Sequence, residues 1–536
     1  MNCSTVIAKY LQAAGIRHVF GYPGDPNVEV IEALRREGLE FVLARREGTA
    51  GFMAQAYGQI TGRPGVCLST LGPGSSNLVN AVANAYLDRV PMLAFSGQIE
   101  QKREHTFTHQ VLDHDLMFSP ITKWTARIAP DTVGTVLRRA IRITIAERPG
   151  PVHITTPADV VGAEASDDAV LLPPMAPASH EVQAFATPGA PDARSRLAAA
   201  KRPVALAGIS ALRAGATGAL VRLAENLGCP VVVSPMAKGV VPEDHPYYAG
   251  TLDMACNELL WELLDAADLI LAVGFDAVEL IKPWTPAAPV IHVDSTPNTD
   301  QIYAAETELV GPIGVILDHL SEISGSSARW SEAEIAAHRD KLRRLYYAGR
   351  VPGRLNPTDV IDVARAALPD DAIVSADVGS HKLLVGQGWT TYLPGGVVMT
   401  NGLSSMGYSL PAAITAKLLN PERSVACFIG DGGFAMVQGE LGLAASLGLG
   451  LGLTIVVFCD GSLNRIELKQ MARQYPSSGT RIEPTDMVML AQSMGCDGVA
   501  VDNIAELERA FADGAAPDRP LVIGANIDPS QYAAQF

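Results

Sequence analysis

Residues 425–470 read VACFIGDGGFAMVQGELGLAASLGLGLGLTIVVFCDGSLNRIELKQ and decide the fold. The stretch contains two short apolar runs, Val425 to Ile429 and Leu453 to Phe458, each typical of a buried strand. A helix-like segment lies between them, and an aspartate follows each run, Asp431 and Asp460. In a βαβ unit with a right-handed crossover, both aspartates lie at the carboxyl ends of parallel strands. Open α/β sheets bind their ligands at that edge.

Two carboxylates at one sheet edge repel each other unless a cation lies between them. Mg²⁺ is bound through one or two carboxylates, a carbonyl and the phosphates of a substrate or cofactor. Gly430, Gly432 and Gly433 allow the backbone to approach such a ligand closely. The stretch therefore predicts a magnesium site that takes a diphosphate. The alternative interpretation is a plain glycine-rich turn.

The Gly430-Asp431-Gly432 turn and the segment CDGSLNRIELKQ resemble the thiamine diphosphate (ThDP) motif of acetohydroxyacid (acetolactate) synthases and related 2-oxo acid decarboxylases. The resemblance implies that Asp431, Asp460 and the carbonyl of Ser462 hold Mg²⁺. Cys459 stands where the family has Asn, and Leu463 stands at its aromatic position, so the substrate-facing side departs from the family pattern. The resemblance further implies cofactor contacts from Gly430, Asp431, Gly432, Gly433, Ser462, Leu463 and Asn464.

Composition disfavours several classes of protein. The 536 residues predict about three domains of ordinary size. A net charge of −16 disfavours nucleic acid and anionic membranes as partners. Seven cysteines without CxxC spacing, and an N-terminus without a signal-peptide pattern, indicate reduced thiols in a cytoplasmic protein. The uncharged run 441–458 is interpreted as a buried helix, a turn and an interior strand, not as a membrane span.

Residues 1–165 alternate short apolar runs with helical patterns, which predicts a doubly wound parallel sheet. Three segments resemble the pyrimidine-binding domain of ThDP enzymes: FGYPG at 20–24, REGTAGFMA at 46–54 and GPGSSN at 72–77. By that resemblance Glu47 is catalytic and hydrogen-bonds N1′ of the pyrimidine. The alternative role for Glu47 is a helix N-terminal carboxylate that complements the dipole. Arg46 precedes it where many relatives have His. The resemblance also implies cofactor contacts from Pro23, Pro73 and Asn77.

Three further residues are candidates for handling the substrate. Asp25 lies in a Gly-Asp-x-Asn context that resembles pyruvate-type decarboxylases, where this Asp moves protons on the intermediate. Gln110 with Asp113 resembles a segment of acetolactate synthases, in which His109 takes the place of a Phe. His109 is either a structural donor or a substrate-facing group. We name Asp25, His109 and Gln110 beside Glu47 as candidate catalytic residues.

Residues 166–195 are predicted to be a linker because they are rich in Ala, Pro, Ser and Asp. Residues 196–328 predict a second βα series, the central domain. Because Gly208-Ile209-Ser210 lacks the G-x-G-x-x-G fingerprint, we expect scaffold here and no FAD, although relatives sometimes hold a nucleotide. Residues 329–355 predict a linking helix with a capping box from Ser331 to Glu334.

Residues 356–536 predict the diphosphate-binding domain. By the family resemblance Gly379, Ser380 and His381 lie at the diphosphate oxygens. The segment NGLSSMG at 401–407 resembles the part that bends the cofactor. There the carbonyl of Ser404 accepts a hydrogen bond from the cofactor and Met406 is the apolar wedge; the alternative for Met406 is core filler. Glu440 is interpreted as a core carboxylate or one behind the site, and Glu467 as a catalytic or a solvated residue.

Taken together, these features predict a three-domain α/β ThDP enzyme of doubly wound parallel sheets. The family resemblance implies a homodimer or dimer of dimers with active sites between subunits. It implies decarboxylation of a small-molecule 2-oxo acid and transfer of the product to a second carbonyl. Simple decarboxylation to an aldehyde is the alternative, followed by a non-catalytic subunit of the same fold.

Overall fold

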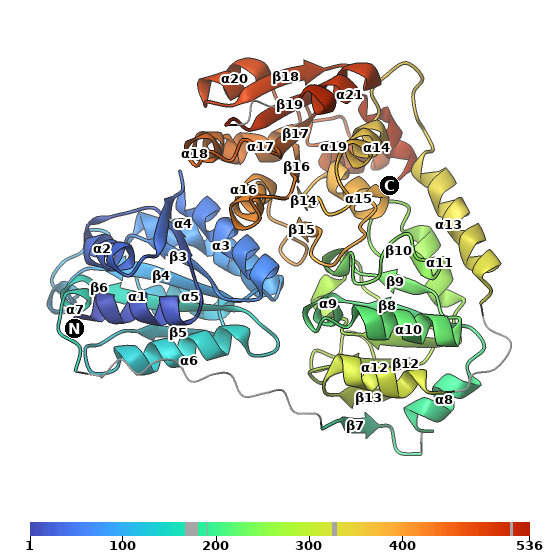
Figure 1. Ribbon diagram of the computed structural model, residues 1–536, viewed down its shortest axis with the longest axis horizontal. Helices are drawn as coiled ribbons and strands as arrows, with labels where there is room; N and C mark the ends of the chain where they lie inside the picture. Colours follow the sequence, from blue (N-terminus) through green and yellow to red (C-terminus); the bar gives the residue numbers. More distant parts are fainter. Residues whose placement is uncertain (167–180, 190, 324–329, 515–517) are drawn as a thin grey trace. The chain divides into compact units, whose positions relative to one another are not determined.

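A computed structural model of the chain describes residues 1–166, 181–189, 191–323, 330–514 and 518–536 (Figure 1). The described residues form three sheets, and the strands within each are parallel except for one edge strand. The predicted α/β class with three doubly wound sheets is therefore confirmed. Much of the predicted linker 166–195 and the end of the predicted central domain lie outside the described residues.

The first and third sheets share one strand order. In chain order, each sheet runs second, first, third, fourth, sixth, fifth. The first sheet contains β1 (His18–Gly21), β2 (Glu40–Leu43), β3 (Gly65–Ser69), β4 (Met92–Gln98), β5 (Trp124–Arg127) and β6 (Pro151–Pro157). The third contains β14 (Ile373–Ala376), β15 (Val397–Met399), β16 (Val425–Gly430), β17 (Leu453–Cys459), β18 (Asp497–Val501) and β19 (Leu521–Asn526).

The middle sheet has the order β10-β9-β8-β11-β12-β13-β7, with β7 antiparallel to β13. Apart from β7, this is the classical order of dinucleotide-binding sheets. Its strands are β7 (Gln183–Ala186), β8 (Pro203–Ala207), β9 (Val231–Val233), β10 (Tyr248–Thr251), β11 (Leu269–Val273), β12 (Val290–Asp294) and β13 (Thr307–Val310). Strand β7 lies within the predicted linker, where four exposed residues pair with β13.

Helices connect the strands and bury apolar faces against them (Figure 1). Around the first sheet these are α1 (Cys3–Ala13), α2 (Val28–Arg36), α3 (Glu47–Thr61), α4 (Pro73–Leu87), α5 (His114–Phe118), α6 (Val133–Ile145) and α7 (Ala158–Val161). With the middle sheet are α8 (Ala193–Ala199), α9 (Ile209–Arg213), α10 (Thr217–Leu227), α11 (Glu258–Asp265) and α12 (Ile313–Ser321). The remaining helices are α13 (Glu332–Tyr346), α14 (Pro357–Ala367), α15 (Ser380–Gly388), α16 (Ser409–Leu419), α17 (Asp431–Val437), α18 (Leu441–Ser446), α19 (Asn464–Ala472), α20 (Met487–Ser493) and α21 (Ile504–Asp513).

The chain divides into two compact units. The first consists of Met1–Ala176, Leu403–Pro421 and Met436–Leu449, and the second of Pro177–Gly402, Glu422–Ala435 and Gly450–Phe536. The first unit therefore gathers α16 and α18 with the first sheet, and the second unit holds the middle and third sheets around one continuous core.

The predicted strands at 425–429 and 453–458 are confirmed, as is the capping box between Ser331 and Glu334. The run 441–458 forms α18, a turn and β17, as predicted. Across the residues that the structure describes, no helix combines the length and apolarity needed to cross a membrane. All seven cysteines carry free thiols, and six of them are buried.

Candidate active site

The third sheet presents the predicted diphosphate site at its carboxyl edge. Strand β14 pairs with β15 on one side and with β16 on the other, so the chain reverses its direction of winding between β14 and β16. Ligands of open α/β sheets bind at such a switch point. Residues 377–381 follow β14, Asp431 follows β16, and Asp460 follows the neighbouring β17.

Asp431 and Asp460 form a half-buried carboxylate pair. The two carboxylate oxygens of Asp431 accept hydrogen bonds from the amides of Gly432 and Gly461, each at 2.8 Å, and Asp460 accepts from Ser462 N at 3.1 Å. Burial and then the charge of Asp431 raise the pKa of Asp460 to about 7, and burial also raises the pKa of Asp431. A bound cation relieves both penalties, so the pair fits Mg²⁺.

The other ligands of such an ion have to come from elsewhere. Within the described ranges, no group of three or more His, Cys, Asp or Glu side chains is arranged to hold a metal. Two carboxylates, the Ser462 carbonyl and diphosphate oxygens are an oxygen set of the kind that Mg²⁺ takes when it is bound with a phosphorylated cofactor.

Two helix N-termini beside this pair form a cradle that is suited to the predicted diphosphate. Helices α15 and α19 begin next to each other, because Ser380 Oγ donates a hydrogen bond to Asn464 Oδ1 at 2.7 Å. Free amides and the helix dipole make such ends favourable for phosphate groups. Gly379 precedes α15 with a φ of 155°, and a Cβ there would lie 2.7 Å from the ring of His381. The cradle therefore requires glycine at this position.

His381 is fixed in the same cradle. Its side chain is buried, with Nε2 at 3.0 Å from Asp377 Oδ1 and the ring stacked on Phe458 at 5.4 Å between centroids. Its other ring nitrogen, Nδ1, lies close to Gly430, because a Cβ built on that glycine would be 3.4 Å from it. Residues 379–381, predicted to bind diphosphate, thus lie beside Gly430 of the magnesium motif.

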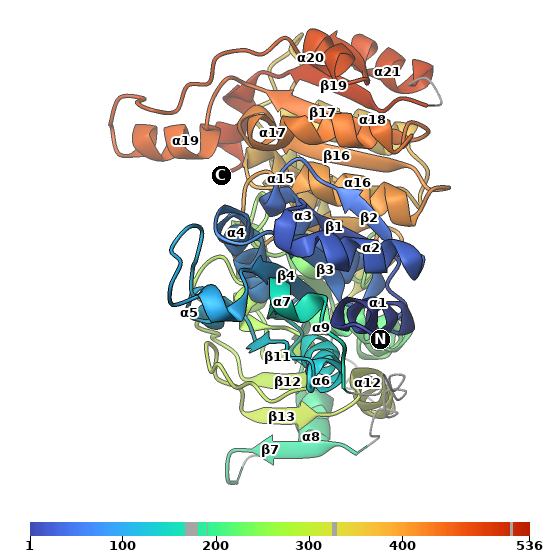
Figure 2. The same ribbon diagram turned by 90° about the vertical axis from the view of Figure 1, so that its left-hand side faces the viewer.

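Glu467 is buried rather than solvated, so the solvated interpretation is wrong. Its carboxylate accepts a hydrogen bond from Ser462 Oγ at 2.5 Å and pairs with Arg481 at 2.6 Å. Arg481 also faces Ser462 across an isolated antiparallel bridge. Glu467 therefore fixes the residue whose carbonyl is the predicted metal ligand. Figure 2 shows α19, which carries Glu467, projecting beyond the edge of its sheet.

In the first unit, Glu47 is the first residue of α3 and is 9% exposed. Its Oε2 accepts a hydrogen bond from Asn77 Nδ2 at 3.1 Å. Its Oε1 lies close to Gly74, where a Cβ would be only 3.2 Å away. The carboxylate is thus placed against the start of α4, next to Pro73 and Asn77. The predicted pyrimidine-binding residues 47, 73 and 77 are brought together.

Glu440 holds the start of α3. Its Oε1 accepts hydrogen bonds from Arg45 N at 2.9 Å and from Thr49 Oγ1 at 2.5 Å. Its Oε2 is buried and has no hydrogen-bond partner among the residues that the structure describes. Burial raises the pKa of Glu440. Because Arg45 and Thr49 flank Glu47, Glu440 fixes the turn that carries Glu47.

The predicted substrate residues lie on exposed turns of the first unit. Asp25 opens the short 3-10 helix after β1, preceded by the exposed Pro23, and is exposed. His109 and Gln110 are exposed too, and Gln110 takes a φ of 61°, unusual for a residue with a side chain. Its backbone lies against Gly72, where a Cβ would come within 2.8 Å of Gln110 O.

Ser404 and Met406 also belong to the first unit. Ser404 has a φ of 57°, a strained conformation of the kind that concentrates at ligand sites. The segment is held by Asn80, whose Nδ2 donates to Ser405 Oγ at 2.8 Å. Met406 is half-buried. His114, by contrast, is a core residue: its Nε2 lies 3.0 Å from Ser75 Oγ, and burial lowers its pKa to about 4.

Family models of the thiamine pyrophosphate enzymes match the chain in three places. The N-terminal TPP binding domain matches residues 1–117, the central domain residues 191–320, and the C-terminal TPP binding domain residues 377–525.

The chain belongs to the thiamine pyrophosphate enzyme family.

Curated relatives of this thiamine pyrophosphate enzyme match over nearly its full length. Acetolactate synthase of Bacillus subtilis is 29% identical, covering 98% of this chain and 93% of that protein. Catabolic acetolactate synthase of Raoultella terrigena is 30% identical over 98% and 94%. The probable 2-ketoarginine decarboxylase AruI of Pseudomonas aeruginosa is 32% identical over 96% and 92%. The relatives thus include both synthases and a decarboxylase.

The middle sheet does not fit a dinucleotide. A dinucleotide pyrophosphate lies at the helix that follows the first strand of such a sheet. Here that helix, α9, has five residues, and its first amide, Ile209 N, already donates to both oxygens of Glu279 at 3.0 and 3.1 Å. Glu279 also accepts from Asp276 N at 3.0 Å and from Ser234 Oγ. A carboxylate of the chain itself fills the phosphate position.

Space at that position is equally restricted. A Cβ on Gly208, which precedes α9, would lie 2.4 Å from Phe275 Cα and 2.5 Å from Glu279 Oε1. Burial raises the pKa of Glu279 to about 8. The sequence lacks the glycine fingerprint, and in the structure Glu279 occupies the position at α9 where a pyrophosphate would bind. Both observations disfavour a dinucleotide at the middle sheet.

Proposed function

We propose that this enzyme binds ThDP and Mg²⁺, decarboxylates a 2-oxo acid and transfers the resulting acyl-anion equivalent to a second carbonyl, as a transferase of the acetolactate synthase type. The observation that carries the proposal is the half-buried pair Asp431 and Asp460 at neighbouring strand ends, flanked by the α15 and α19 N-termini. The named relatives add the reaction class, since two of the three are acetolactate synthases.

In this proposal each group of residues has one task. Asp431, Asp460 and the Ser462 carbonyl hold Mg²⁺, and the start of α15 takes diphosphate oxygens. Bound ThDP supplies an electron sink for decarboxylation. Glu47, held by Asn77 at 3.1 Å, holds a proton at the pyrimidine nitrogen. Asp25, His109 and Gln110 face the substrate, and Pro23, Gly432, Gly433 and Leu463 line the cofactor.

Simple decarboxylation to an aldehyde is the second candidate function. It is favoured by Asp25, which lies exposed directly after β1 at the switch point of the first sheet, and by the relative named as a 2-ketoarginine decarboxylase. The two functions differ in their product. Pyruvate with ThDP and Mg²⁺ yields acetolactate in the first and acetaldehyde in the second, and a panel of 2-oxo acids that includes 2-ketoarginine extends the comparison.

The variant Glu47→Gln tests the proposal in either form. Loss of a positioned proton-transfer group lowers kcat by roughly 10²–10⁴-fold. Glu29→Gln is the matched control, because Glu29 is an exposed first-turn glutamate of α2. Unchanged turnover in Glu47→Gln would eliminate the proposed role of Glu47, whereas no turnover of any 2-oxo acid by the unmodified protein would favour a non-catalytic subunit.

We further propose that the middle domain holds no FAD, since Glu279 fills the phosphate position. We propose a homodimer or dimer of dimers in which each active site uses two chains. A cytoplasmic location is in keeping with seven free thiols.

A further inference from the structure

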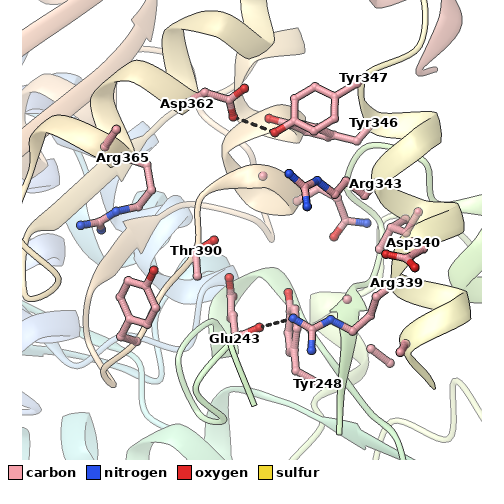
Figure 3. Close-up of a pocket in the computed structure, with 18 of the residues that line it drawn as sticks. Glu243, Tyr248, Arg339, Asp340, Arg343, Tyr346, Tyr347, Asp362, Arg365 and Thr390 are labelled. Atoms are coloured by element: carbon pink, nitrogen blue, oxygen red, sulfur yellow. Dashed lines mark hydrogen bonds between the residues drawn. The ribbon is translucent and has the colours of Figure 1, made fainter. Parts of the chain in front are cut away.

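The second unit contains a cavity of about 830 Å³ that the proposed function does not use (Figure 3). Three segments line it: residues 243–250 of the middle domain, one face of α13, and α14 with residues 387–392. Its size lies within the range of small-molecule sites, which is about 300–1,000 Å³. The cavity therefore offers room for a metabolite at the junction of α13 with two sheet domains.

Arg339 and Arg343 lie four residues apart on α13 and both line this cavity. Residues at that spacing occupy one face of a helix. Figure 3 shows both side chains reaching from α13 toward the space between Glu243, Thr390 and Asp362. Two guanidinium groups on one helix face are suited to grip the oxygens of a carboxylate or phosphate.

Neither arginine is neutralised by a carboxylate in the described part of the chain. Arg339 donates only to carbonyl oxygens, those of His245 at 3.0 Å and Glu243 at 3.1 Å, which fix its guanidinium without cancelling its charge. The side chain of Arg343 is exposed and makes neither a hydrogen bond nor an ion pair with any described residue; its guanidinium carbon lies 6.0 Å from the Tyr347 ring, and its charge acts only at longer range on Asp362. Both charges are thus available to a ligand.

The acidic residues of the cavity wall are mostly engaged. Glu243 is buried and paired with Lys238 at 2.5 Å. Asp362 accepts a hydrogen bond from Tyr347 OH at 3.0 Å and pairs with Arg350 at 3.5 Å. Asp370 pairs with Arg365 at 3.7 Å.

The third arginine at the cavity is engaged as well. Arg365 donates to the carbonyls of Leu368 and Pro369 and stacks on Trp389 at 4.5 Å, so it turns away from the centre. Among the lining residues the exposed Asp340 opposes Arg339 and Arg343, and Asp362, already engaged by Tyr347 and Arg350, attracts Arg343 as well. The side of the cavity formed by α13 is therefore the cationic side.

We propose that this cavity binds a small organic anion, a phosphorylated or dicarboxylic metabolite, whose charged group is held by Arg339 and Arg343. The tyrosine rings on the wall, Tyr347 and Tyr392, contact its carbon skeleton. Helix α15 begins at Ser380 and His381 of the candidate diphosphate site and ends at Gln387 and Gly388 on this wall. A ligand here thus touches the helix that carries the diphosphate cradle.

The test is calorimetric titration of the full-length protein, saturated with ThDP and Mg²⁺, with inorganic phosphate and separately with succinate at constant ionic strength. The variants are Arg343→Gln and, as a matched control, Arg344→Gln, an exposed neighbour on α13 that does not line the cavity. We expect saturable binding that weakens by roughly tenfold or more in Arg343→Gln and not in Arg344→Gln.

Binding of phosphate alone, or of succinate alone, supports the proposal and identifies which kind of metabolite is the source. The proposal is overturned if neither phosphate nor succinate binds to the unmodified protein. It is also overturned if the Arg343→Gln and Arg344→Gln variants bind the probe equally well. The experiment measures binding and not turnover. Its outcome is therefore independent of the proposed function, which the Glu47→Gln variant tests.

Discussion

Asp460 is the residue whose charge links the magnesium site to pH. Burial and the neighbouring Asp431 raise its pKa to about 7. In the metal-free protein, a carboxyl with a raised pKa favours the folded state below its unfolded pKa of about 4, and that contribution is lost as the pH rises through about 7. Metal ligands must be deprotonated, so Mg²⁺ binding has the opposite pH dependence.

We therefore expect Mg²⁺, titrated in the presence of ThDP, to bind about tenfold more weakly at pH 6 than at pH 8, since one proton with a pKa near 7 has to leave. The measurement is calorimetry or tryptophan fluorescence across that range. Asp460→Asn should bind weakly at every pH, without the slope. A flat profile in the unmodified protein would show that Asp460 is not a ligand.

Glu440 acts through the residues on either side of Glu47. Replacing it with Ala leaves the amide of Arg45 without its acceptor, at a cost of about 1–3 kcal/mol if that group stays unpaired, while the hydroxyl of Thr49 keeps only the Arg46 carbonyl as acceptor. Glu440→Gln keeps an acceptor oxygen at Oε1. We expect Glu440→Ala to lower kcat at least tenfold and the thermal midpoint by several degrees, and Glu440→Gln to recover most of both.

Kinetics separate this positioning role from a general loss of fold. If kcat is restored in Glu440→Gln together with the midpoint, the carboxylate acts by holding α3. If Glu440→Gln folds normally and remains as inactive as Glu440→Ala, its negative charge, not its hydrogen bonds, is what the site needs.

At the scale of elements, the sequence predicted what depends on local pattern. The apolar runs of β16 and β17 and the capping box of α13 are local signals, and their structures match. The sequence could not assign a specific role to Glu440, because its partners Arg45 and Thr49 lie about 390 residues away in the chain. Strand β7 was not predicted from the sequence, because its residues are exposed and pair only at a sheet edge.

At the start of α9, too, the sequence could not predict a contact between residues that lie far apart in the chain. Missing glycines indicated the absence of a dinucleotide, but the carboxylate that replaces it comes from Glu279, some 70 residues along the chain. We expect the purified protein to carry no flavin, and FAD or ADP to leave its thermal midpoint unchanged. Flavin bound in stoichiometric amount would contradict this.

The variant Glu279→Ala checks the physical reason. It removes the carboxylate that accepts from the half-buried amide of Ile209 and the buried amide of Asp276, and we expect a loss of about 2–4 kcal/mol in the free energy of unfolding. Urea denaturation measures it. Because α9 has only five residues, removal of the carboxylate should not create FAD binding.

For the whole molecule, the shared strand order of the first and third sheets has a functional meaning. The carboxyl edge of each sheet carries one half of the predicted chemistry: Asp25 and Glu47 follow β1 and β2 of the first sheet, and Asp431 and Asp460 follow β16 and β17 of the third. In the proposed mechanism a working site needs both halves. If the halves come from two chains, as we propose, activity is a property of the oligomer.

Complementation between two inactive variants tests this. Glu47→Gln lacks the first half and Asp431→Asn the second, so each homo-oligomer should be inactive. In a mixed dimer one site combines both intact halves and the other combines both damaged ones. With random pairing on co-expression, half of the dimers are mixed and each has one active site of two, so we expect roughly a quarter of the unmodified activity. If each site is built within a single chain, co-expression restores nothing. Mixing the separately purified variants without subunit exchange is the control, and it should stay inactive in both cases.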